Sequence, residues 1–182
     1  MIQRYFFILL LSSKLFLQAG VQDTAIQIGT EAPTFSLPTI DNTYISLRDF
    51  CGKKLRKPWK NNIKNVVVLS FFATWCKPCM EEIPHLEKLM AEFAGLPVRF
   101  YLIDVGEDRN KISKFIKNKN IRIPVLLDRY QKTAEKYDAL TLPRLVVIDK
   151  NGIIQQEMKG FKDAESFEAD LAELLKKLVA DS

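Results

Sequence analysis

The stretch FFATWCKPCMEEIP, residues 71–84, decides the fold of this chain. Two cysteines, Cys76 and Cys79, stand two residues apart in it, and the run VVVLSFF, residues 66–72, leads into them. A continuous β-branched and aromatic run is typical of a strand buried on both faces, at the centre of a sheet with parallel strands. Because apolar residues recur at helical spacing from Lys77 to Phe93, we expect a helix to begin beside the cysteine pair.

A cysteine pair between a buried strand and a helix points to redox chemistry. Cys76 would lie where the first N–H groups of the helix are unpaired, and the positive end of the helix dipole stabilises a thiolate there. Since the thiolate attacks a disulfide, we expect Cys76 to be the nucleophile and Cys79 to resolve the mixed disulfide. Pro78 suits an early helical position because its missing N–H would have had no partner. Lys77 adds a positive charge that favours the thiolate, and Trp75 would lie beside the exposed sulfur as an apolar platform.

Two other uses of the cysteine pair fit the sequence less well. A structural zinc ion needs about four ligands. The chain has one further cysteine, Cys51, and one histidine, His85, which lies six residues after Cys79 on the same expected helix. An inert structural disulfide is the other alternative, and it would be unusual so close to a buried strand. The pattern therefore favours redox activity. We expect no metal and no cofactor, because sulfur carries the electrons.

The rest of the chain predicts one α/β domain. Asn151-Gly152 is a strong hairpin turn signal between two extended runs. The other expected elements are two short extended pieces within 35–47, a buried strand at 98–105, helices at 109–119 and 131–137, an extended piece at 124–128 and a closing helix at 164–179. This order predicts a three-layer α/β/α architecture with a mixed central sheet.

Composition excludes some classes of protein. The chain has 182 residues, 47% apolar and 27% charged, with a formal net charge of +5. This fits one domain with a leader and argues against a protein with many membrane spans. Residues 53–64 carry six positive charges and no negative one, and so do residues 109–122. These runs are either solvated faces or docking patches for an acidic partner or an anionic lipid surface. We expect no nucleic-acid binding, because no binding motif accompanies the charge.

The motifs together resemble the thioredoxin superfamily. The signature is ATWCKPC after a buried strand, with TLP downstream at 141–143. The segments APTFSL, EEIPHLEKL and DKNG are similar to its secreted TlpA/ResA-type branch, and the resemblance covers roughly residues 29–180. It implies an exported thiol-disulfide oxidoreductase that reduces selected protein disulfides, with cytochrome c biogenesis and its apocytochrome c cysteines as one setting. A membrane electron donor would re-reduce it.

The resemblance also assigns individual residues. Pro143 would be a cis-proline that faces the cysteine pair. It would expose the backbone of Leu142 to an incoming peptide. Glu82 matches the acidic residue that this branch carries on the active-site helix. It would handle protons in place of the buried Asp of thioredoxin, whose position here is Ser70; the alternative is a solvated acid in the first helical turns. Arg144, an unusual residue after the cis-proline, could tune partner choice.

Domain boundaries follow from changes in composition along the chain. Residues 1–19 read as a signal peptide or N-terminal anchor, 20–34 as a linker, and 35–182 as the thioredoxin-like domain with a basic insertion at about 51–65. The apolar part of the leader is broken by polar residues and is shorter than the roughly 17–25 residues of a spanning helix. We therefore expect a periplasmic or otherwise exported protein, with anchoring to the inner membrane as the alternative.

Two rival functions share this fold. A peroxiredoxin-like peroxidase needs a Thr or Ser three residues before its reactive cysteine, whereas Thr74 lies only two residues before Cys76. A thioredoxin-fold metal-delivery protein of the copper-chaperone type needs a distant histidine near the site, and His85 lies on the active-site helix itself. The third cysteine, Cys51, is interpreted as a small semi-buried residue or as a second redox thiol.

Overall fold

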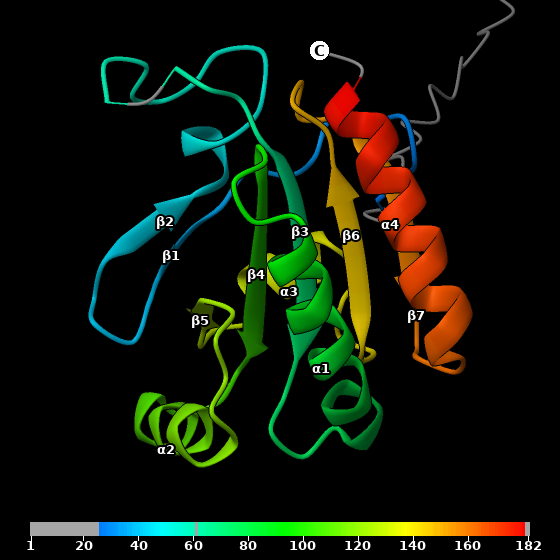
Figure 1. Ribbon diagram of the computed structural model, residues 1–182. Helices are drawn as coiled ribbons and strands as arrows, with labels where there is room; N and C mark the ends of the chain where they lie inside the picture. Colours follow the sequence, from blue (N-terminus) through cyan, green and yellow to red (C-terminus); the bar gives the residue numbers. More distant parts are fainter. Residues whose placement is uncertain (1–25, 61, 181–182) are drawn as a thin grey trace, which may run out of the picture.

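The computed structural model describes residues 26–60 and 62–180 (Figure 1). The expected leader at 1–19 and the start of the expected linker lie outside the described residues. Within the described part of the chain, no helix is both long and apolar enough to cross a membrane.

A five-stranded mixed sheet forms the centre of the domain, in the order β5-β4-β3-β6-β7. The central strand β3 pairs in parallel with β4, and β4 pairs in parallel with β5, whereas β6 is antiparallel to both β3 and β7. The strands are β3 (Val66–Phe72), β4 (Val98–Val105), β5 (Val125–Asp128), β6 (Arg144–Ile148) and β7 (Ile154–Lys159). The VVVLSFF run thus occupies the middle of the sheet with all seven residues buried, as the sequence predicts.

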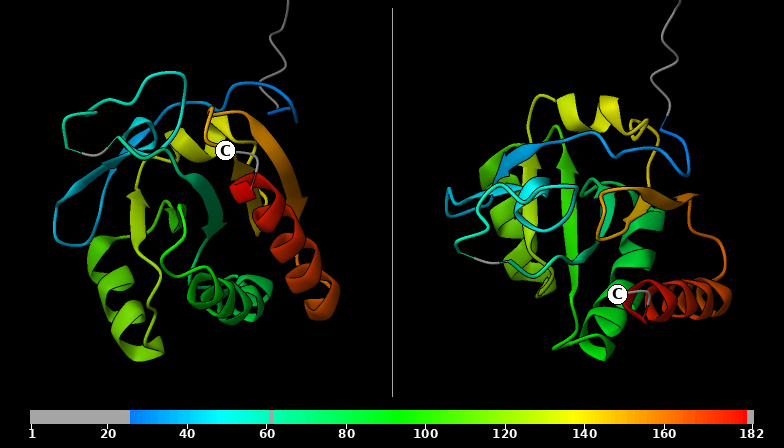
Figure 2. Two further views of the ribbon diagram at one scale, coloured as in Figure 1. Left: turned by 45° about the horizontal axis from the view of Figure 1, so that its top comes forward. Right: turned by 90° about the horizontal axis from the view of Figure 1, so that it is seen from above.

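Helices cover both faces of this sheet, which confirms the three layers. They are α1 (Lys77–Glu92), α2 (Arg109–Lys119), α3 (Lys132–Lys136) and α4 (Ala164–Ala180). The helices α1, α2 and α4 lie on one face of the sheet and α3 lies on the other (Figure 2). Their buried side chains belong to two separate apolar clusters, one on each face. The hairpin of β1 (Ser36–Pro38) and β2 (Tyr44–Ser46) joins α3 in its layer, followed by a 3-10 turn, η1 (Leu47–Asp49).

The side chains of β3 alternate between the two faces of the sheet, which explains why both faces must be covered. Val68 and Phe72 belong to the apolar cluster beneath α1, whereas Val67, Leu69 and Phe71 belong to the cluster beneath α3. Successive side chains of a strand point to opposite faces, so an uninterrupted apolar run must be covered twice. The cysteine pair lies in the first of these two layers.

The expected linker is partly wrong. From residue 26 onward the stretch packs on the hairpin formed by β6 and β7. Gly29 N–H donates to Ile154 O at 2.8 Å, and Ala32 N–H donates to Gly152 O at 2.8 Å. Ile26 and Ala32 are buried. The folded domain therefore begins no later than Ile26, because the backbone of this stretch finds its hydrogen bonds in the hairpin.

The basic insertion is a loop whose two ends lie close together. Asn65 N–H donates to Phe50 O at 2.7 Å, which closes the loop just before β3. Its start lies against the β6–β7 turn, where Gly52 N–H donates to Lys150 O at 3.1 Å. A Cβ on Gly152 would come within 2.9 Å of the Gly52 backbone, and its φ of +83° also favours glycine. The insertion lies at the amino end of β3, opposite the cysteine pair (Figure 1).

Candidate active site

Cys76 and Cys79 form a disulfide at the start of α1. Cys76 is the N-cap residue, and the backbone N–H of Cys79 donates to Cys76 Sγ at 3.3 Å. This donor lies in the first helical turn, where N–H groups have no partner within the helix. When the pair is reduced, the same N–H and the helix dipole would stabilise a Cys76 thiolate.

Both cysteines are nearly buried in the disulfide form, Cys76 at 4% exposure and Cys79 at 1%. The expectation of an exposed Cys76 sulfur is therefore wrong for this form of the pair, because both residues are part of the apolar cluster beneath α1. Trp75 is 71% exposed and offers the apolar surface next to the pair. Pro78 occupies the first turn of α1, and Lys77 Nζ lies 4.0 Å from Glu81 Oε1 on the exposed side.

The peptide bond between Leu142 and Pro143 is cis. Pro143 is buried and Leu142 is half-buried, directly before β6. Within the described part of the chain, the backbone N–H and C=O of Leu142 make no hydrogen bond. A peptide segment laid beside this residue would find both groups open.

Glu82 is buried beneath the pair rather than solvated. Its Oε1 accepts a hydrogen bond from Ser70 Oγ of β3 at 2.6 Å, and the whole residue is 1% exposed. Burial raises the pKa of Glu82 to about 7, because the Ser70 hydrogen bond offsets only part of the cost of burying a charge. At neutral pH this carboxyl group can both hold and release a proton. It lies one helical turn after Cys79.

Sequence reasoning missed Glu107, which holds the loop before the cysteines. The Glu107 carboxylate accepts hydrogen bonds from Thr74 N–H at 2.5 Å and from Thr74 Oγ1 at 2.8 Å. Lys111 Nζ lies 2.5 Å from the same carboxylate. Burial alone would raise the pKa of Glu107, but the bonds from Lys111 and Thr74 outweigh it and lower the pKa. Glu107 follows β4, which is parallel to β3. Because parallel strands end at the same edge of a sheet, its place in the sequence could have indicated that it lies near the cysteine loop.

A second acid under this loop was also missed. Asp104, near the end of β4, accepts a hydrogen bond from Glu107 N–H at 3.2 Å through Oδ2. Its Oδ1 is buried without a partner in the described structure. Burial raises the pKa of Asp104 to about 7, and the nearby Glu107 charge adds to this shift. Asp104 therefore supports the Glu107 loop from within the sheet.

Cys51 and His85 lie away from this chemistry. Cys51 is buried in the layer of α3, on the other side of the sheet from the cysteine pair, and burial raises the pKa of its thiol to about 12. A thiol of this kind is a poor nucleophile at neutral pH. His85 Nδ1 lies 2.5 Å from Glu168 Oε1, and its ring stacks on Phe161. No cluster of three metal-ligating side chains occurs among the residues that the structure describes.

Arg144 does not face a partner, contrary to the expectation. Its side chain is buried, and its guanidinium lies 2.7 Å from Glu157 Oε2 and 3.4 Å from Asp138 Oδ2. Asp138 precedes the cis-proline loop and Glu157 lies on β7. Arg144 therefore ties this loop to the edge of the sheet.

Comparison with known proteins agrees with this geometry. Residues 28–157 match the model of the AhpC/TSA family. The thiol-disulfide oxidoreductase ResA of Bacillus thuringiensis subsp. konkukian is 31% identical over 157 residues, which cover 86% of this chain and 82% of that protein. ResA of Geobacillus kaustophilus is 30% identical over 150 residues, covering 82% of this chain and 79% of its own length.

Solved structures show the same fold. The thioredoxin domain of a thiol-disulfide oxidoreductase from Bacteroides vulgatus superposes with a TM-score of 0.67 at 20% identity, covering 85% of this chain and 99% of that domain. StoA from Bacillus subtilis superposes with a TM-score of 0.59 at 20% identity, covering 78% of this chain and 97% of its own. The chain therefore belongs to the AhpC/TSA family of thioredoxin-fold proteins and, within it, to the ResA-type thiol-disulfide oxidoreductases.

Proposed function

We propose that this oxidoreductase acts as an exported reductant of selected protein disulfides, with Cys76 as the attacking thiol. The observation that carries the proposal is the donation from Cys79 N–H to Cys76 Sγ at the helix start. In the reduced protein, the Cys76 thiolate attacks a substrate disulfide and forms a mixed disulfide, while one substrate sulfur leaves as a thiolate. Cys79 then attacks Cys76 Sγ, which closes the Cys76–Cys79 disulfide and releases the second substrate thiol. Two electrons pass from the cysteine pair to the substrate.

Cys79 needs a proton acceptor before it can attack, because it is buried and a thiol is a poor nucleophile. We assign this role to Glu82. Its burial keeps the carboxyl pKa near 7, close to that of an efficient general base at neutral pH. Ser70 orients the carboxyl group through its hydrogen bond. Glu82 lies one turn along α1 from Cys79 and is buried on the same helix.

Substrate recognition is assigned to Trp75, Leu142 and Pro143. The open N–H and C=O of Leu142 can pair with an extended substrate segment. The exposed ring of Trp75 supplies apolar contact beside the disulfide. Lys77 and Pro78 tune the redox pair, through a positive charge and through the start of the helix.

The cellular setting is the remaining part of the proposal. The leader at 1–19 supports export to a periplasmic or equivalent space, with anchoring to the inner membrane as the alternative. There the chain would receive electrons from a membrane donor and pass them to protein disulfides, with apocytochrome c as one substrate. The basic insertion, Lys53 to Lys64, is exposed over most of its length and suits an acidic partner or an anionic lipid surface.

A trapping experiment tests the assignment of the two cysteines. Cys79→Ser removes the resolving thiol, so the variant should accumulate a mixed disulfide with its partner that a reductant releases and mass spectrometry identifies. Cys76→Ser should trap nothing, and Cys51→Ser should behave like the wild type. Partner capture by Cys76→Ser, or normal turnover by Cys79→Ser, would contradict the assignment.

A peroxide-consumption assay on the same proteins tests the peroxidase alternative, for which we expect no catalytic turnover.

A further inference from the structure

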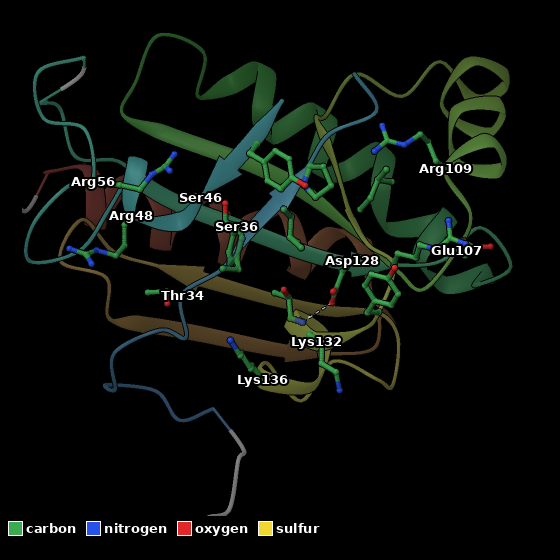
Figure 3. A pocket seen from close by; sticks show the side chains of 18 residues that line it. Thr34, Ser36, Ser46, Arg48, Arg56, Glu107, Arg109, Asp128, Lys132 and Lys136 are labelled. Atoms are coloured by element: carbon green, nitrogen blue, oxygen red, sulfur yellow. Dashed lines mark hydrogen bonds between the residues drawn. The ribbon is translucent and has the colours of Figure 1, made fainter. Parts of the chain in front are cut away.

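A groove of about 710 Å³ lies between the β1–β2 hairpin and the segment that contains α3 (Figure 3). One wall is the strand segment Thr34–Pro38 with the neighbouring strand β2. The other wall is the segment Leu127–Lys136, which contains α3. A single antiparallel β-bridge between Thr39 and Leu126 joins the two walls. An open trough with an extended strand along one wall can accept an extended peptide segment.

Positive charge dominates the rim of this groove. It has six basic residues, Arg48, Arg56, Arg109, Arg129, Lys132 and Lys136. Figure 3 shows Arg48 and Arg56 at one end, Arg109 at the other, and Lys132 and Lys136 along the α3 side. The two acids in the lining, Glu107 and Asp128, are buried. Glu107 is bound by Thr74 and Lys111, and Asp128 accepts hydrogen bonds from two backbone N–H groups of α3.

Three of the six cations have no carboxylate partner in the described part of the chain. Arg48 donates to the backbone carbonyl of Lys54, Arg109 donates to the carbonyls of Thr39 and Ile40, and Lys136 makes no ion pair. The other three are partnered by Asp49, Asp108 and Glu135. The rim therefore carries three cations without a carboxylate partner, and they come from three separate segments.

The groove also offers aromatic and apolar contacts. Phe35, Leu37 and Leu127 line it from the buried core. Tyr44 and Tyr130 stand on opposite walls and are 61% and 78% exposed. Exposed tyrosines beside arginines are the side chains that dominate protein-binding surfaces. This combination favours a polypeptide segment with both acidic and apolar side chains.

One residue links the groove to the redox site. Glu107 lines one end of the groove, and its carboxylate also holds the Thr74 backbone two residues before Cys76. A protein whose disulfide is presented to Cys76 would therefore have this end of the groove within reach. The basic insertion shares only Arg56 with the groove, so the groove is a separate surface.

We propose that this groove docks an extended acidic segment of the partner proteins with which the cysteine pair exchanges disulfides. The proposal rests on the proposed function for the identity of those partners. Charge complementarity selects the acidic segment, the apolar lining and the two tyrosines hold its apolar side chains, and the Glu107 end directs it toward the active site. Association should weaken with salt, because the cations are exposed and screened.

Binding of a defined peptide tests the groove. The probe is a fluorescein-labelled ten-residue peptide of alternating Glu and Leu with one Tyr, and its control carries Gln in place of Glu. Fluorescence anisotropy with the full-length oxidised protein should show binding of the acidic peptide in preference to the Gln peptide, with an affinity that falls as salt rises. Arg48→Glu combined with Lys136→Glu should weaken binding at least tenfold. The matched control, Lys114→Glu with Lys177→Glu, reverses two exposed lysines on α2 and α4 and should change binding less than twofold.

Each outcome decides between docking and its alternatives. Equal binding of the two peptides, or equal losses in the two double variants, would overturn the proposal. So would binding of phosphatidylglycerol vesicles with the same sensitivity to the groove variant but no peptide binding, which would assign the groove to lipid. If charge reversal disturbs folding, as circular dichroism would show, Tyr130→Ala replaces it and should weaken binding severalfold. Reduction of hydroxyethyl disulfide by the wild-type chain tests the proposed function separately, because it needs no groove.

Discussion

Glu82→Gln separates the charge of the buried carboxyl from its shape. In the folded protein, burial raises the pKa of Glu82 from 4.5 to about 7. A raised pKa means that the folded state binds the proton more tightly than the unfolded chain. The stabilisation from the protonated carboxyl is therefore complete below about pH 4.5 and is lost as pH rises through 7. Glutamine is neutral at every pH and can still accept the Ser70 hydrogen bond.

The size of the effect follows from the shift. Each unit of pKa corresponds to about 1.4 kcal/mol, so the wild type should lose about 3 kcal/mol relative to Glu82→Gln between pH 4 and pH 9. Urea unfolding of the oxidised proteins across this range measures the difference. The titration of Asp104 runs in the same direction but is present in both proteins, and it cancels. Glu81→Gln is the matched control, because Glu81 is exposed on the same helical turn, and its curve should stay parallel to that of the wild type.

The two proteins should also differ in kinetics. If Glu82 accepts the proton of Cys79, Glu82→Gln should fold normally but exchange disulfides more slowly, and the limb of its pH profile near 7 should disappear. A stability difference that stays constant within about 0.5 kcal/mol from pH 4 to 9 would refute the buried charge. Unchanged exchange rates from about pH 5 to 9 would refute the proton transfer even if the stability result held.

Two further predictions concern the other charged groups. Glu157→Gln should lower the free energy of unfolding by about 2 kcal/mol, because it leaves the buried Arg144 guanidinium with Asp138 alone. Arg144→Met should lower it less in the same urea titration, since the carboxylates of Asp138 and Glu157 are partly exposed. A larger loss in Arg144→Met than in Glu157→Gln would contradict this. Reversal of Lys53, Lys54 and Lys57 to Glu should slow reduction of the partner captured by Cys79→Ser but not of a small neutral disulfide, if the insertion docks an acidic partner. Equal losses on both substrates would indicate misfolding instead.

Local patterns were enough to predict most of the fold. The strand at 66–72, the helix at the cysteines and the hairpin at Gly152 each follow from the residues that form them. The cis bond before Pro143 and the position of Glu82 came from the family resemblance, and the structure has the first as expected. These features depend on short segments or on a motif, so no knowledge of the packing was needed.

The missed contacts depend on the register between paired strands. Phe72 pairs with Asp104 across β3 and β4. If this register is continued by two residues, Thr74 lies beside Gly106 and Glu107. This explains why Glu107 can bind the loop before the cysteines. The burial of Arg144 has the same origin, because it pairs with Lys159 on β7 and Glu157 lies two residues from that partner on the same face. A cation that looks exposed in the sequence becomes buried once this register is fixed.

One edge of the sheet connects the catalytic and the binding chemistry. The parallel strands β3, β4 and β5 end at this edge. The cysteine pair follows β3, Glu107 follows β4, and β5 ends at Asp128, just before Tyr130. The pair faces the layer of α1, whereas the groove faces the layer of α3. Because Cys76, Cys79 and Glu82 are not among the residues that line the groove, partner binding and sulfur chemistry should be separable by mutation. Variants of the groove rim should change which proteins are reduced, and variants of Glu82 should change how fast any disulfide is reduced.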